Sequence, residues 1–265
     1  MKKIMIIGCG AMGGAILSGC LAKGVWKKEE VLVKEHTSAL SKEKAEQYGI
    51  TASMDGHEAA EADLVLLAVK PNIIPDVLKE ISAFRPKRVL SIAAAVTVET
   101  LESGLTAGTQ VIRVMPNTPA SVGEGMAAIT AGTHAEADFI AMAEEIFSAL
   151  GKEAVVTERQ LDEMGALSGA GPGYAFVIID ALADAGVRIG LPRKLAIEAA
   201  AQTLYGAAKM VLETGKHPAE LRDQVTSPGG TTIAGIHAME QRGIRAALMD
   251  GVVACLAKSD EMSRK

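Results

Sequence analysis

The fold of this chain is decided by the stretch Lys3-Ile4-Met5-Ile6-Ile7-Gly8-Cys9-Gly10-Ala11-Met12-Gly13 near its start. The first part is an apolar run rich in isoleucine, which is typical of a strand buried on both faces of a parallel sheet. The second part has the spacing GxGxxG and opens a helical run at 14–23. A strand, a glycine turn and a helix in this order predict a doubly wound α/β domain that binds a dinucleotide.

Each glycine of this motif has its own physical role. Gly8 permits the turn, Gly10 lets a pyrophosphate approach the backbone, and Gly13 lets the helix pack closely on the strand. The N–H groups at the start of the helix also favour a phosphate. We therefore expect the cofactor to contact Gly8, Gly10, Ala11, Met12 and Gly13. A glycine turn without a ligand is the alternative interpretation.

The residues after the second expected strand leave the choice between NADH and NADPH open. Glu35 lies 22 positions after Gly13, about where an acidic residue binds the ribose 2′-OH of NAD. The neighbours that could instead hold the 2′-phosphate of NADP are Lys34, His36, Thr37 and Ser38. We place Glu35, His36 and Thr37 in the cofactor site and expect NAD(P)H.

Apolar runs continue the α/β pattern through the first half of the chain. The expected strands are 4–7, 31–33, 64–68, 89–92 and 111–115, with helical patterns between them. This alternation predicts a Rossmann-like, doubly wound parallel sheet, which binds its ligand at the carboxyl ends of the strands. Lys70, at one such end, either binds a phosphate or points to solvent. The further cofactor residues expected at these ends are Ala68, Val69, Lys70, Pro71, Ala93, Met115 and Asn117.

The chain changes character after about residue 157, where helical patterns take over. We expect helices at 159–167, 174–187, 193–214, 219–224, 232–241 and 244–258. The helix at 193–214 is apolar on almost every side, and a segment of about a hundred residues can scarcely bury it alone. We therefore expect packing against a second subunit, with a monomeric bundle as the alternative. The predicted domains are a dinucleotide-binding domain at 1–157 and an all-α substrate-binding and dimerisation domain at 158–265.

Composition limits the class of protein further. The 265 residues are 49% apolar and 3% aromatic, and the net charge of −5 argues against a nucleic-acid-binding surface. The three cysteines and five histidines fit no metal-ligand spacing, so we expect no metal and a reducing cytoplasm. The chain opens on a strand rather than on a signal peptide. No apolar run reaches about 18 residues without a charge, so we expect no membrane span.

A second glycine-rich stretch, Thr226-Ser227-Pro228-Gly229-Gly230-Thr231-Thr232, precedes a helical run near the end of the chain. Pro followed by Gly-Gly is a strong loop signal, and threonine is a favoured N-cap. Free N–H groups at a helix start attract an anion, and glycines let a ligand approach the backbone. With hydroxyl groups at Ser227, Thr231 and Thr232, the loop suits a small carboxylate substrate. An ordinary capped helix is the alternative.

A nicotinamide site together with an anion site implies hydride transfer. Oxidising an alcohol needs a base at the hydroxyl group. The β-hydroxyacid dehydrogenases place a lysine on the long helix after the domain junction, but this chain has no Lys or Arg in 160–187. An imine can arrive already protonated, so glycines and hydroxyl groups suffice for its reduction. The alternatives are a β-hydroxyacid-type dehydrogenase and a catalytically idle dinucleotide sensor, and the complete 227–232 loop argues against the sensor.

The chain resembles pyrroline-5-carboxylate reductase along essentially its whole length. The most specific matching segment is 221–232, which is similar to the pattern that identifies this family. The other matching segments are 8–13, 68–71, 113–120, 122–125 and 167–169. The family usually has a second serine where this chain has Ala170. Because this chain lacks that hydroxyl group, we do not assign 168–174 to the substrate site.

The resemblance implies reduction of 1-pyrroline-5-carboxylate to L-proline by NAD(P)H. It also implies a helical domain that interlocks two subunits, often within larger rings. By position, the backbone of Gly230 and Thr231 would bind the substrate carboxylate, and the hydroxyl group of Thr232 would lie at the ring nitrogen. The residues that would line the nicotinamide are Met115, Asn117, Val69 and Lys70. Ser227 and Gly229 complete the expected substrate site.

Overall fold

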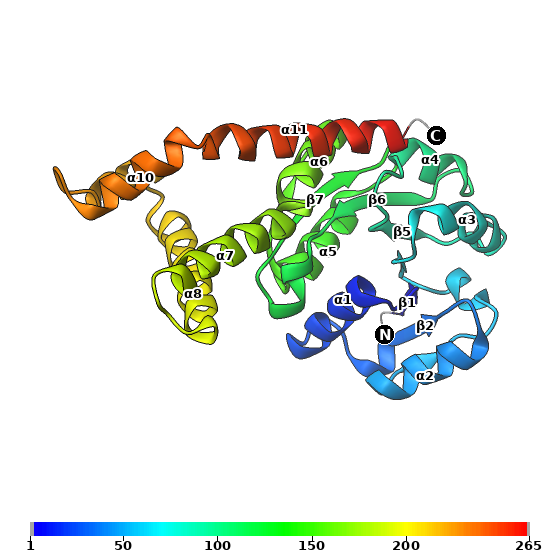
Figure 1. Ribbon diagram of the computed structural model, residues 1–265. Coiled ribbons are helices and arrows are strands. Elements are labelled where there is room, and N and C mark those ends of the chain that lie inside the picture. The colour runs from blue at the N-terminus through cyan, green and yellow to red at the C-terminus, as the bar shows by residue number, and fades with distance from the viewer. Residues whose placement is uncertain (1–2, 264–265) are drawn as a thin grey trace. The chain divides into compact units, whose positions relative to one another are not determined.

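The computed structural model describes residues 3–263 of the chain (Figure 1). The chain forms two compact units. One holds the residues up to Ala170 together with the segment from Cys255 onward, and the other holds Gly171–Ala254. This division differs from the predicted domains at two places, because 158–170 and the segment from Cys255 onward both go with the first unit; the boundary expected after residue 157 stays a prediction.

The first unit is built on one sheet with the order β3-β2-β1-β4-β5-β6-β7-β8. Neighbouring strands from β3 to β6 in this order are parallel. The five expected strands all form within one residue of their expected ends, and the predicted doubly wound sheet is confirmed. The strands are β1 Ile4–Ile7, β2 Val31–Lys34, β3 Thr51–Ala52, β4 Leu64–Leu67, β5 Arg88–Ser91, β6 Gln110–Met115, β7 Gly125–Ala131 and β8 Gly151–Val155.

Three strands, β3, β7 and β8, were missed in the sequence. β7 runs antiparallel to β6, and β8 runs parallel to β7, so the sheet is not parallel throughout. β3 has only two residues, and β7 and β8 are rich in Gly, Ala, Lys and Glu, which are poor strand formers. Their pairing is therefore set by the neighbouring strands and not by their own side chains.

Helices cover both faces of this sheet. Along β1, Ile4 and Ile6 enter one core with α1 and α5, while Met5 and Ile7 enter the other core with α3. The helices of this unit are α1 Ala11–Ala22, α2 Ser38–Tyr48, α3 Ile74–Ser82, α4 Val98–Ser103, α5 Ala137–Ser148 and α6 Glu158–Met164. The short turns are η1 Lys28–Glu30, η2 His57–Ala60, η3 Pro71–Ile73, η4 Thr118–Val122 and the π-helical η5 Gly165–Gly169.

The glycine loop holds α1 against the sheet through backbone contacts. Gly8 has a φ of +88°, which side chains of L residues rarely allow. A Cβ atom at Gly13 would lie 2.4 Å from the Gly8 carbonyl oxygen and 3.0 Å from the Ala68 Cβ. Both glycines are therefore required by the fold itself, as the motif predicts.

A buried arginine ties α6 to the sheet, beside β6 and β7 (Figure 1). The side chain of Arg113 is 1% exposed, and its guanidinium donates to Glu158 at 2.9 Å and to Asp162 at 2.7 Å. A capping box of Thr157 and Gln160 starts the helix. Because loss of these carboxylates would leave the buried guanidinium without a partner, Arg113 holds α6 in place.

The second unit consists of helices with very little interior. Its helices are α7 Gly171–Arg188, α8 Arg193–Thr214, α9 Pro218–Gln224, α10 Thr231–Gln241 and the first part of α11 Ile244–Ser263, close to the expected positions. Among the described residues of this unit, the buried apolar side chains are Ala183, Ala196 and Ala200. Large apolar side chains stay exposed, including Phe176, Val177, Leu195, Tyr205, Leu212, Met249 and Val253. One copy of this unit therefore leaves most of its apolar surface uncovered.

The helical stretch Glu158–Arg188 is long and apolar enough to pass a composition test for a membrane span, with a mean hydropathy of 1.3. Only 11% of its most apolar window is buried. An apolar helix face that packs on a second subunit passes the same test, so this result is weak evidence for a membrane.

Candidate active site

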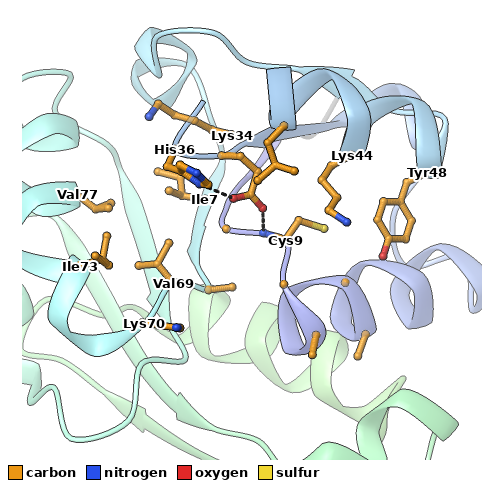
Figure 2. A pocket seen from close by; sticks show the side chains of 18 of the residues that line it. Ile7, Cys9, Lys34, His36, Lys44, Tyr48, Val69, Lys70, Ile73 and Val77 are labelled. Atoms are coloured by element: carbon orange, nitrogen blue, oxygen red, sulfur yellow. Dashed lines mark hydrogen bonds and ion pairs between the residues drawn. The ribbon is translucent and has the colours of Figure 1, made fainter. Parts of the chain in front are cut away.

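A large pocket opens at the carboxyl ends of β1, β2 and β4 (Figure 2). Its volume is about 1010 Å³, at the upper end of the range for small-molecule sites. This is where doubly wound sheets bind their ligands. The residues assigned to the cofactor that line this pocket are Gly8, Gly10, Ala11, Glu35, His36, Ala68, Val69 and Lys70.

The other residues assigned to the cofactor do not line this pocket, and their cofactor contacts stay predictions. The Thr37 hydroxyl accepts the Leu40 N–H at 3.2 Å and so caps α2. Pro71 begins η3, and Ala93 is 3% exposed within the core. The complete set outside the pocket lining is Met12, Gly13, Thr37, Pro71, Ala93, Met115 and Asn117.

Gly10 differs from the other two glycines of the motif. It is exposed, its φ of −72° is open to any residue, and a Cβ atom there would meet nothing within 4 Å. No side chain caps the start of α1, and its first turn holds no acidic residue. The fold therefore does not require a glycine at position 10, whereas a phosphate lying on the helix N-terminus would.

Glu35 lies at the end of β2, and its carboxylate reaches the glycine loop. One oxygen accepts the Cys9 N–H at 2.5 Å, and the other lies 4.0 Å from Nδ1 of His36 (Figure 2). The Glu35 N–H donates to Ser41 Oγ at 2.9 Å. With its side chain only 12% exposed, Glu35 is held by the loop in one place at the pocket wall.

The thiol of Cys9 is a buried part of the pocket lining. Burial, and secondly the charge of Glu35, raises the pKa of Cys9 to about 11. The thiol therefore stays protonated at neutral pH and fills space. Cys20 and Cys255 are also free cysteines, and burial raises the pKa of Cys20 to about 12.

One side of the pocket was not found in the sequence. Leu40, Lys44 and Tyr48 are spaced by four residues, so they share one face of α2, and that face lines the pocket. Figure 2 shows Lys44 directed into this space. Its ammonium donates to Gln47 at 3.0 Å, and within residues 3–263 no carboxylate pairs with it. The spacing by four is the signal that could have identified this face.

Lys34, which was a candidate for a 2′-phosphate contact, has a partner. Its ammonium lies 3.0 Å from a carboxylate oxygen of Glu80, and its side chain is 14% exposed. Lys44 is therefore the better placed cation for an extra phosphate in this pocket.

The carboxyl end of β5 carries a strained residue. Ala95 has a φ of +58°, a left-handed conformation that costs about 1–2 kcal/mol for a residue other than glycine. Strain of this kind gathers at functional sites. It lies two residues after Ala93, which the sequence assigns to the cofactor site.

The predicted substrate loop belongs to the second unit. Gly229 has a φ of +67°, and a Cβ atom at Gly230 would lie 2.4 Å from Ser227 Oγ. The Gly230 N–H donates to the Ser227 carbonyl at 3.0 Å and closes the turn. The turn thus requires glycine at position 229, whereas a side chain at position 230 would displace the Ser227 hydroxyl.

Gly230 is the N-cap of α10, so the expectation of a threonine cap is wrong. The turn that the Gly230 N–H closes on Ser227 ends at this residue, so the helix starts one residue later, at Thr231. No side chain caps the helix, and its first turn holds no acidic residue. Thr231 and Thr232 are exposed, and the hydroxyl of Thr232 has no partner in the described part of the chain. This helix start therefore offers N–H groups and a hydroxyl to an anionic ligand.

Within the described residues, one group of three side chains could hold a metal ion: Asp55, His57 and Glu58. The ring of His57 bonds to Asp55, and this bond, followed by the charge of Glu58, raises the pKa of His57. The group comes from one short surface segment, and none of its members lines the pocket.

Both halves of the chain match known protein families. Residues 158–262 match the family model described as pyrroline-5-carboxylate reductase dimerisation. Residues 3–95 match the family model described as NADP oxidoreductase, coenzyme F420-dependent.

Relatives named pyrroline-5-carboxylate reductase match the whole chain. The protein from Methanosarcina acetivorans is 43% identical, covering 100% of this chain and 99% of its own length. The Escherichia coli protein is 42% identical and covers 99% of each. The structure of the Coxiella burnetii enzyme has a TM-score of 0.92 at 34% identity, covering 100% and 99%. A Plasmodium falciparum pyrroline carboxylate reductase, solved with NADP bound, has a TM-score of 0.87 at 29% identity, covering 99% and 98%.

Gly10 and Gly13 offer a matched pair of substitutions. Gly13→Ala places a methyl group against backbone, so the free energy of unfolding should fall by about 1–3 kcal/mol. Gly10→Ala should change it by less than about 1 kcal/mol, yet raise the Kd for reduced cofactor at least about tenfold. Urea unfolding and a fluorescence titration with NADH and NADPH measure the two effects. An unchanged cofactor Kd in Gly10→Ala would contradict binding across this loop.

Proposed function

The chain belongs to the pyrroline-5-carboxylate reductase family, and from this premise we propose how its residues carry out the reaction. That reaction is the reduction of the cyclic imine 1-pyrroline-5-carboxylate to L-proline by NAD(P)H, the last step of proline biosynthesis. The observation that carries the proposal is a full-length match in which both glycine-rich loops are intact.

The first unit holds the cofactor, which supplies a hydride when it is bound. The open backbone at Gly10 and the uncapped start of α1 fit a pyrophosphate. The carboxylate of Glu35 accepts hydrogen bonds from the ribose hydroxyl groups. Val69, Lys70 and Met115, at the ends of two strands, line the nicotinamide. Lys44 faces the added phosphate when the cofactor is NADPH.

The substrate carboxylate binds at the start of α10. Its contacts are the backbone of Gly230 and Thr231, with Ser227 and Gly229 forming the turn behind them. Because the Gly230 N–H already closes this turn at 3.0 Å, Thr231 supplies the free N–H of the two. The positive end of the helix dipole adds about 0.3–1 kcal/mol for an anion at this place.

Thr232 places its hydroxyl group at the ring nitrogen. The hydride adds to the carbon of the C=N bond, and the nitrogen keeps or gains one proton. The hydroxyl polarises the C=N bond or relays that proton. This role suits an exposed hydroxyl with no partner of its own in residues 3–263.

The helical unit joins two copies of the chain into a homodimer, and dimers can build a larger assembly. Two observations support this. The match at 158–262 is to a dimerisation family, and one copy of the unit buries little apart from three alanine side chains. The functional boundary then falls after residue 157, where this match begins. Three free cysteines support a cytoplasmic location.

The first test of this mechanism is Thr232→Ala. Loss of a hydroxyl donor at the reacting centre should lower kcat/KM for 1-pyrroline-5-carboxylate by roughly a hundredfold. The Kd for NAD(P)H should not change, since Thr232 serves only the substrate. Steady-state kinetics and a cofactor titration measure both, and Thr232→Ser should restore most of the activity. An unchanged rate in Thr232→Ala would remove this residue from the mechanism.

The choice of cofactor is tested by two substitutions, one that removes a negative charge and one that removes a positive charge. Glu35→Gln removes a carboxylate that repels the 2′-phosphate, so the kcat/KM ratio of NADPH to NADH should rise roughly tenfold. Lys44→Gln should lower kcat/KM for NADPH roughly tenfold and leave that for NADH unchanged. Lys42→Gln on the same helix serves as the matched control. Equal losses with both cofactors in Lys44→Gln would exclude a 2′-phosphate contact.

The assembly is tested on the exposed face of α7. Phe176 is 64% exposed in one copy, so Phe176→Asp should destabilise a dimer that buries it and lower the Tm. Light scattering measures the mass of the assembly. Met54→Asp, on an exposed apolar residue of the first unit, should leave the mass unchanged. A wild-type protein that is monomeric at micromolar concentration would refute the dimer.

A further inference from the structure

Asn117, just after β6, uses both ends of its side-chain amide inside the protein. Its Oδ1 accepts the Met126 N–H of β7, and its Nδ2 donates to the Ser168 carbonyl, each at 2.9 Å. The residue is only 9% exposed. The amide therefore joins the start of β7 to η5, which lies 51 positions further along the chain.

The Ser168 carbonyl cannot accept the usual α-helical hydrogen bond. In an α-helix it would accept the N–H of the residue four positions on, but that residue is Pro172, which has no N–H. A carbonyl left without a donor is costly when it is shielded from water. Asn117 supplies the missing hydrogen bond.

This hydrogen bond falls on an unusual turn of helix. In η5 the Ala170 N–H reaches the Gly165 carbonyl at 2.9 Å, a π-helical bond across five residues. The side chain of Met115 lies against the turn: Cβ atoms at Gly165 and Gly169 would lie 3.4 and 3.6 Å from its atoms. Single π-helical turns occur frequently at functional sites.

The same segment is anchored at its other end. Arg113, four residues before Asn117, pairs with Glu158 and Asp162 of α6, and α6 runs directly into η5. Arg113 within β6 thus fixes the start of the 158–169 segment, and Asn117, two residues beyond the strand, fixes its end.

We propose that Asn117 is a positioning residue, which holds the η5 turn and the Met115 side chain packed on it, and so keeps the nicotinamide aligned for hydride transfer. This inference rests on the proposed function. It replaces the direct nicotinamide contact that the family resemblance suggests for Asn117. A residue whose amide is engaged at both ends and nearly buried acts through the η5 turn that it holds.

The test separates alignment from cofactor binding. In Asn117→Ala, kcat for 1-pyrroline-5-carboxylate should fall roughly 10- to 100-fold, because small misplacements slow a transfer step strongly. The Kd for NADH and NADPH should stay within about twofold, since the pocket is lined by other residues. With NADH deuterated at the transferred position, the isotope effect on kcat should rise, because the hydride step becomes rate-limiting.

Asn117→Asp keeps the acceptor for Met126 and replaces the donor to Ser168 with a carboxylate oxygen that repels the Ser168 carbonyl. It should show the same fall in kcat, and it keeps the proposal testable if Asn117→Ala folds poorly. A cofactor Kd weakened tenfold or more in either folded variant would make Asn117 a cofactor contact and overturn the proposal. Unchanged kcat and isotope effect would overturn it too. An inactive wild-type protein would instead count against the proposed function itself.

Discussion

The contact between the Gly13 backbone and the Gly8 carbonyl sets the geometry on which the cofactor pocket depends. It brings the start of α1 directly onto the ends of β1 and β4, with no side chain between them. The N–H groups of the helix then face the pocket, and Glu35 from the neighbouring strand reaches the same loop through the Cys9 N–H. Gly10 is the one glycine of the motif that the fold does not require, so a bound ligand is the reason for a glycine at this position.

The second unit differs from the first in what it buries. Its helices expose apolar side chains, whereas the first unit buries them in two cores. Burial of apolar side chains is the main driving force of folding, so a unit whose interior is three alanines depends on a partner. Membership of the reductase family and the dimerisation match explain this surface without a membrane. The proposed substrate loop belongs to this unit, so on this proposal assembly and activity depend on the same helices.

The sequence predicted the features that depend on short-range chemistry. Apolar runs in the sequence predicted the five strands and the helix 193–214. The spacing of the glycines predicted the roles of Gly8 and Gly13, because backbone clashes there depend on nearby residues. β7 and β8 were missed because their alanine-rich and charged sequences pair only through their neighbours. Lys44 was not assigned to the pocket because the sequence does not show which face of α2 points toward it. The role of Asn117 depends on a carbonyl 51 positions away, which no local pattern reveals.

The most direct measurement is the oxidation of NADH and NADPH by the purified wild-type protein with 1-pyrroline-5-carboxylate, followed by the absorbance of the reduced cofactor. Our account predicts turnover with this imine, formation of L-proline in equal amount, and no reaction with β-hydroxy acids. A folded protein that binds NAD(P)H yet leaves the imine unreduced would contradict it. Turnover of a β-hydroxy acid instead would point to alcohol chemistry at this site.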